Sequence, residues 1–166
     1  MNLAVLLIVI LSSLKWGDWK NWQKYHSTMI LAGYGNLLFQ FLYCDNDPWL
    51  INPGFYQNHT IFELVFSVII LPFTAFLFLS NYPDSPIKKF LHFSYYISVY
   101  VGFEYLYLLT GNITYHYGWS FMYSVAWDIM MFAIWAVHFR KPIKAYILAI
   151  IVVIVIAALF PVKCRL

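Results

Sequence analysis

Six long apolar segments dominate the sequence and restrict what the chain can fold into. A helix needs roughly 20 mostly apolar residues to cross the ~30 Å hydrocarbon core of a bilayer. Five of the six segments approach or reach that length, and the first is short. The sequence therefore predicts an all-α fold, a polytopic transmembrane bundle of six helices, or of five if the first segment does not cross. The segments cover residues 1–14, 27–43, 60–80, 90–110, 119–138 and 143–161.

Composition predicts the same class. Of the 166 residues, 63% are hydrophobic and only 10% are charged, which is incompatible with an ordinary water-soluble core. The formal charge of +3 comes from the loops and gives no basis for a nucleic-acid partner. We expect the lipid bilayer as the partner, together with a small molecule or another membrane protein as a second possible partner, and no cofactor. Residues 1–166 show no linker or repeat, so one domain is predicted. The sequence does not predict the oligomeric state.

The distribution of Lys and Arg predicts the orientation of the helices. Two of the loops, 44–59 and 111–118, contain no Lys or Arg. Because basic residues are retained on the cytoplasmic side, these two loops are expected outside, in a multi-pass protein of the cell membrane. The basic residues of the other loops are Lys15, Lys20, Lys24, Lys88, Lys89, Arg140, Lys141 and Lys144.

Cysteine and histidine spacing predicts no metal site. Cys44 and Cys164 are too few and too far apart for a metal motif, although they could pair if both lie outside. The histidines and carboxylates show no HxxxH or ExxH spacing.

The fifth segment carries a polar stripe. Ser124, Asp128, Met131, Trp135 and His138 follow one another at steps of 4, 3, 4 and 3. At ~100° per residue these positions lie within about 40° of one direction. Asp128 lies well inside this apolar segment. A carboxylate there would be unpaired if it faced lipid, so the stripe must face protein.

Other polar groups are expected at a similar depth, in the outer half of the bundle. Glu104 and Asp128 differ by only about 5 Å in height, and the short 111–118 connection should make their helices adjacent and antiparallel. We therefore expect Asp128→Asn to be tolerated better than Asp128→Leu, since the amide would keep the hydrogen bonds of the carboxyl group. Further polar residues at this level are Asn36, Gln40, Glu63 and, in the loops, His59 and His116.

Three functions are compatible with these groups. They could form a structural hydrogen-bonded network between helices. They could form an outward-facing site for a small molecule, a proton or another cation. Glu104 and Asp128 could also act as general acid and base in an enzyme for a lipid-like substrate. The sequence does not decide among them.

Several runs resemble a known family. Gly35-Asn36-Leu37-Leu38, Glu104-Tyr105 and Tyr115-His116-x-Gly118-Trp119 with Ser124, Asp128 and His138 resemble a family of small, uncharacterised multi-pass membrane proteins of spore-forming bacilli and clostridia. The resemblance implies a bacterial plasma-membrane protein of five or six helices and supplies no activity. With the residues it matches, the candidate polar site comprises Asn36, Gln40, Glu63, Glu104, Tyr115, His116, Trp119, Ser124, Asp128 and His138.

Overall fold

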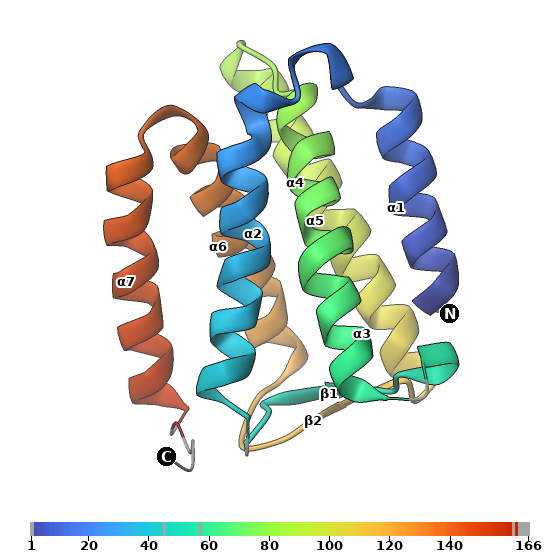
Figure 1. Cartoon of the computed structure of the whole chain (residues 1–166). Helices are drawn as coiled ribbons and strands as arrows, with labels where there is room; N and C mark the ends of the chain where they lie inside the picture. The colour runs from blue at the N-terminus through green and yellow to red at the C-terminus, as the bar shows by residue number, and fades with distance from the viewer. Residues whose placement is uncertain (1, 45, 57, 161, 163–166) are drawn as a thin grey trace. The chain divides into compact units, whose positions relative to one another are not determined.

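The computed structural model describes residues 2–44, 46–56, 58–160 and 162. Within them the chain is helical apart from its connections, and the prediction of an all-α fold with six helices is confirmed (Figure 1). The third helix is continuous from α3 to α4 through a π-helical turn, η3. The Cys44–Cys164 pairing lies outside the described residues, because Cys164 is not among them. The helices are α1 (Asn2–Trp16), α2 (Gln23–Leu42), α3 (His59–Val65), η3 (Phe66–Ile70), α4 (Leu71–Ser80), α5 (Pro86–Leu109), α6 (Phe121–Arg140) and α7 (Pro142–Leu159).

Two compact units divide the chain. The first contains Met1–Leu37 and Pro53–His92, and the second contains Leu38–Asn52 and Phe93–Leu166. Each unit therefore combines two stretches of sequence, and α2 and α5 each contribute to both. The single domain expected from the sequence stays a prediction, and the units are described separately below.

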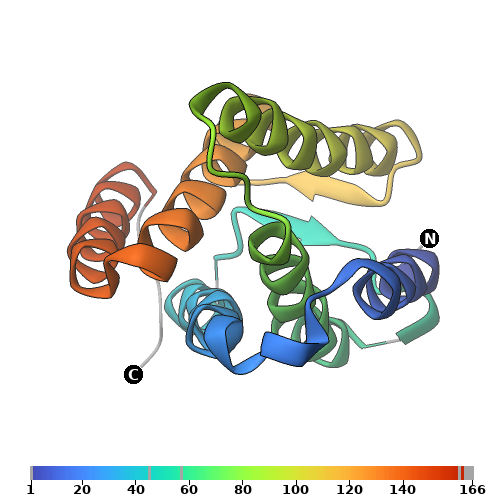
Figure 2. The ribbon, with the colours of Figure 1, turned by 90° about the horizontal axis from the view of Figure 1, so that it is seen from above.

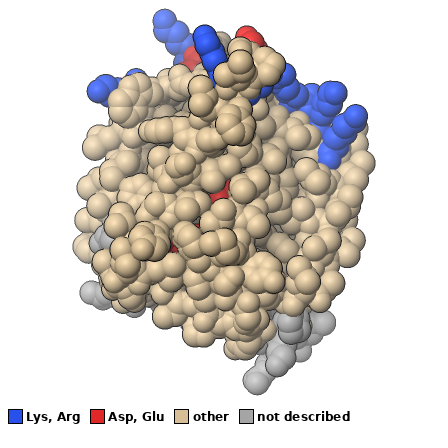
Figure 3. Space-filling model, turned by 180° about the vertical axis from the view of Figure 1, so that it is seen from behind, with Lys and Arg blue, Asp and Glu red and all other residues tan. Residues whose placement is uncertain are grey.

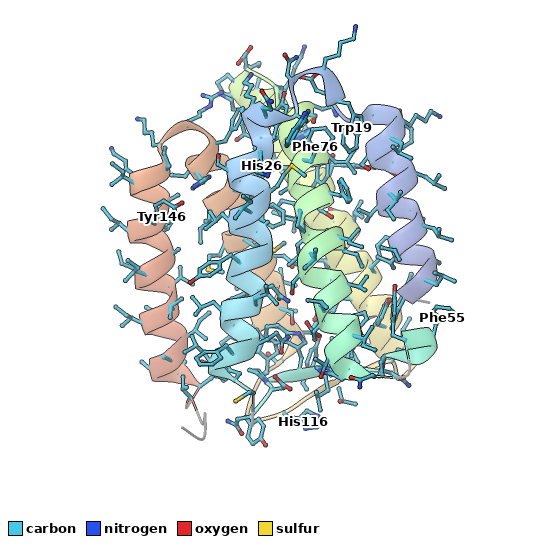
Figure 4. The ribbon with its side chains drawn as sticks, viewed as in Figure 1. Trp19, His26, Phe55, Phe76, His116 and Tyr146 are labelled. Atoms are coloured by element: carbon cyan, nitrogen blue, oxygen red, sulfur yellow. The ribbon has the colours of Figure 1, made fainter. Side chains whose placement is uncertain are left out.

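In the first unit the turn between α1 and α2 is tied to the end of α4. The Trp19 ring meets the Phe76 ring edge-on, with 4.9 Å between ring centroids, and both are labelled in Figure 4. The indole Nε1 of Trp19 donates to the Ser13 carbonyl at 2.7 Å. The backbone N–H of Asp18 donates to Ser80 Oγ at 3.1 Å. Trp19 thus holds the α1–α2 turn in place.

Asp18 organises the same turn through its side chain. Both of its carboxylate oxygens accept hydrogen bonds from Asn21, at 3.0 Å each, and Oδ2 also accepts one from the Tyr25 hydroxyl. Hydrogen bonds to a carboxylate favour its charged form, so the Asn21 amide, followed by Tyr25, holds the pKa of Asp18 below its usual range.

The third helix changes its winding just before Pro72. The N–H of Leu71 donates to the Phe66 carbonyl, five residues earlier, and Pro72 has no N–H to offer. The helix accommodates the proline with a π-helical turn, which takes up one extra residue. Gly33 of α2 approaches this turn so closely that an added Cβ would lie 2.4 Å from the Ser67 carbonyl oxygen.

In the second unit, α6 and α7 pack side by side and are joined through Lys141 alone (Figures 1 and 2). The C-terminal end of α7 is held by an aromatic cluster built around Phe39, Tyr43, Trp119 and Phe160. The Tyr43 hydroxyl donates to the Phe160 carbonyl at 3.0 Å, and the ring centroids of Trp119 and Phe160 are 4.7 Å apart.

The two loops without basic residues are paired with each other. Strand β1 (Trp49–Ile51) runs antiparallel to β2 (Ile113–Tyr115), with Trp49 opposite Tyr115. Just beyond the strands, the His116 N–H donates to the Pro48 carbonyl at 2.8 Å. This ladder fixes the 111–118 connection between α5 and α6.

Three of the described helices are long and apolar enough to span a membrane. They are His59–Ser80, Phe121–Arg140 and Pro142–Leu159, with mean hydropathies of 2.4, 1.3 and 2.6. Helix α1 is apolar but has only 15 residues, whereas α2 and α5 have the length but carry polar side chains along it. Lys15 lies in the last turn of α1 and Arg140 in the last turn of α6. Most of the surface shown in Figure 3 is uncharged, with a little acidic surface visible between the uncharged side chains.

Candidate functional site

Four side chains of the second unit form what we call the acidic cluster: Glu104, Tyr115, Ser124 and Asp128. They come from α5, β2 and α6. The Tyr115 hydroxyl donates to Glu104 Oε1 at 2.6 Å, a length typical of a hydrogen bond to a charged carboxylate. Ser124 lies close enough to Glu104 to favour its charged form. Glu104 therefore accepts one short hydrogen bond, from Tyr115, and has a second hydroxyl group nearby.

Trp119 fixes the orientation of Ser124. Its indole Nε1 donates to Ser124 Oγ at 2.9 Å, and this bond is buried. Because the serine oxygen accepts from the indole, its own proton is available for Glu104. Trp119 also belongs to the aromatic cluster, so the packing around Phe160 and the position of Ser124 depend on one side chain.

Asp128 lies one helical turn beyond Ser124 and is 7% exposed. Its Oδ2 is buried and has no hydrogen-bond partner among the described residues. Among the described residues, the charge that acts on it is the carboxylate of Glu104, which has the same sign. A buried acceptor without a donor costs free energy, about 1–3 kcal/mol for a neutral group and more for a charged one. The cluster thus contains one satisfied and one unsatisfied carboxyl group.

The β ladder places Tyr115 over the cluster. Directly after this residue the backbone turns sharply, with Tyr117 at φ 53° and Gly118 at φ 83°, and leads into α6. Burial, followed by the hydrogen bond and charge of Glu104, raises the pKa of Tyr115 above its usual range. The phenol therefore stays protonated at neutral pH and can serve as a donor.

Asn36 and Glu63 come together in the first unit, in a second cluster at the π-helical turn. Asn36 Nδ2 donates to Glu63 Oε2 at 3.2 Å and to Ser67 Oγ at 2.9 Å. Ser67 Oγ donates to the Glu63 carbonyl at 2.7 Å, and His59 Nε2 lies 3.7 Å from Glu63 Oε1. These contacts link α2 to the third helix. We call this group the Asn36 cluster.

The candidate residues expected to form one site thus belong to two clusters, one in each unit. Three others make neither set of contacts. His116 is exposed in the β2–α6 connection (Figure 4), with its Nε2 3.0 Å from Thr114 Oγ1. His138 is buried near the far end of α6, roughly 21 Å along the helix from Ser124, and its Nε2 lies 3.3 Å from the Tyr146 hydroxyl. Gln40 is half-buried on α2 in the second unit.

Two residues that sequence reasoning missed complete the Asn36 cluster. Ser67 follows Glu63 by four residues, a spacing that places both on one helix face and could have suggested it. Gly33 gave no such signal, because its role depends on the approach of the neighbouring backbone.

Within the described residues, no three His, Cys, Asp or Glu side chains converge as metal ligands would. The acidic cluster itself supplies two carboxylates and two hydroxyl groups, all of them oxygen ligands.

Comparison with protein-family models, with curated proteins and with solved structures finds no match to this chain.

Proposed function

We propose that this is a multi-pass protein of the bacterial plasma membrane, related to the family it resembles, and that its acidic cluster binds a small monovalent cation from the outer side. The three membrane-compatible helices and the alternation of loops with and without Lys or Arg support the placement. The unpartnered Oδ2 of Asp128, buried beside a second carboxylate, is the observation that carries the binding function.

The chemistry of the cluster selects the ligand. The unsatisfied group, Asp128 Oδ2, is a hydrogen-bond acceptor, so the missing partner is a hydrogen-bond donor or a cation. Carboxylate and hydroxyl oxygens prefer hard cations. Mg²⁺ keeps several of its waters and Ca²⁺ takes six to eight oxygens, whereas the few side-chain oxygens of this cluster fit an ion that is easier to dehydrate. Na⁺, or a proton in its place, matches this site, with the second carboxyl group retaining a proton to balance the charge.

Sodium should stabilise the purified protein. We expect the melting temperature in detergent to rise with NaCl relative to choline chloride at equal ionic strength, because an ion that binds only the folded state adds RT ln(1 + [L]/Kd) of stability. Lowering the pH should raise the NaCl concentration needed, since protons compete for the same oxygens.

Replacing Asp128 with Asn should remove this sodium response. The control is Asp18→Asn, which neutralises a carboxylate in the α1–α2 turn and should leave the response intact. An equal response to NaCl and choline chloride in the wild-type protein would contradict cation binding. A response to CaCl₂ alone would contradict the monovalent assignment.

The proposed orientation can be tested by labelling single cysteines in intact cells, after Cys44 and Cys164 are replaced by Ser. Asn52 and Ser85 are both exposed, and they lie in loops assigned to opposite sides. We expect a membrane-impermeant maleimide to label Asn52→Cys from outside and Ser85→Cys only after permeabilisation. Labelling of both from outside would refute the topology.

A further inference from the structure

The acidic cluster contains its own competitor for a cation. The Tyr115 hydroxyl donates a short hydrogen bond to Glu104 Oε1, with 2.6 Å between the two oxygens. Of the two hydroxyl groups in the cluster, this is the one that comes from outside the helices. We propose that Tyr115 is a closing residue of the cation site: its hydroxyl holds Glu104 while the site is empty and leaves when a cation binds. This inference rests on the proposed function.

The origin of Tyr115 supports this role. Glu104, Ser124 and Asp128 stand on α5 and α6, whereas Tyr115 ends β2, in a two-stranded ladder of three residue pairs. So short a ladder is marginal by itself. It is followed by Tyr117, a non-glycine residue with positive φ and a 55% exposed side chain, which adds backbone strain. The segment that carries the hydroxyl is therefore easier to displace than the helices that carry the carboxylates.

The competition follows from charge. A hydrogen bond from a phenol to a carboxylate is favourable because the carboxylate is negative, and a bound cation neutralises that charge and needs the same oxygen. A hydrogen bond to a charged group contributes about 1.5–3 kcal/mol. Since 1.4 kcal/mol corresponds to a tenfold change in affinity, Tyr115 should weaken cation binding by roughly tenfold or more.

Linkage makes the effect reciprocal. If the Tyr115–Glu104 bond opposes cation binding, then a bound cation must oppose that bond to the same extent. A cation bound at the intramembrane site would then lower the stability of the β1–β2 ladder at the outer surface.

The first test compares Tyr115→Phe with Tyr117→Phe in the full-length protein in detergent. Both variants remove one phenolic hydroxyl from the same loop, but Tyr117 has no hydrogen bond to the cluster. From the NaCl dependence of the melting temperature, we expect Tyr115→Phe to bind Na⁺ about tenfold more tightly and Tyr117→Phe to match the wild type. Unchanged or weaker binding by Tyr115→Phe would overturn the inference, because Tyr115 would then be a spectator or a ligand.

The second test needs no variant and covers the case in which Tyr115→Phe does not fold. Amide hydrogen exchange of residues 113–115 in the wild-type protein should become faster in NaCl than in choline chloride. Slower or unchanged exchange, with a melting temperature that does respond to sodium, would overturn the closing role and leave cation binding standing. No sodium response in the wild type or in either variant would instead refute the proposed function.

Discussion

Gly33→Ala should destabilise the protein strongly, by about 1–3 kcal/mol, the cost typical of forcing an extra methyl group into a filled space. An alanine Cβ at this position would lie 2.4 Å from the Ser67 carbonyl oxygen and 3.4 Å from Pro72 Cγ. The first of these atoms is backbone, in a π-helical turn tied to Asn36 through the Ser67 side chain, so it cannot move aside without breaking those hydrogen bonds.

Gly35→Ala is the matched control, two residues along the same helix. An added Cβ there meets nothing within 4 Å. Alanine in a helix interior is favoured over glycine by roughly 0.5–1 kcal/mol, so this variant should be as stable as the wild type or slightly more stable. Melting temperatures in detergent compare the two directly. Equal stability of both alanine variants would mean that α2 and the π-helical turn do not approach as the structure shows.

The two carboxyl groups of the acidic cluster should respond to neutralisation with opposite signs. In choline chloride, without a binding cation, Asp128→Asn should raise stability by about 1–3 kcal/mol, because it removes a buried, unpartnered carboxyl oxygen and its repulsion with Glu104. Glu104→Gln should lower stability by about 1.5–3 kcal/mol, because Tyr115 loses a charged acceptor.

Asp128→Leu refines this comparison. The sequence led us to expect leucine to be worse than asparagine, because leucine would leave hydrogen-bond partners of the carboxyl group unsatisfied. The structure gives Oδ2 no such partner, so leucine should now be tolerated about as well as asparagine. Both variants should lose the sodium response. A large destabilisation by Asp128→Leu together with a neutral Asp128→Asn would show that Asp128 is held in a hydrogen-bonded network after all.

A stabilising substitution in a binding site follows a general pattern, in which such sites hold groups that the fold alone would not favour. Here the cost is specific. Asp128 lies one turn from Ser124 and is buried, and the described charge that acts on it, Glu104, has the same sign. A cation would remove both the missing hydrogen bond and the repulsion.

The sequence by itself determined the fold class. In long apolar segments that leave water, the backbone N–H and C=O groups must hydrogen-bond within the protein, and a helix does this within each segment. It also determined that Ser124 and Asp128 share a face of α6, since helical periodicity fixes that relation locally. The proximity of Glu104 to the same face followed from the shortness of the 111–118 connection.

Tertiary structure decided the rest, because those relations depend on contacts between segments far apart in the chain. Nothing in the spacing of residues shows that Trp49 pairs opposite Tyr115, and this pairing is what brings the phenol to Glu104. The assignment of Asn36 to Glu63 and Ser67 depends on Gly33 and on a π-helical turn whose position no local pattern reports. Depth in a membrane is a single coordinate, and it cannot tell which of several polar groups at one level are neighbours.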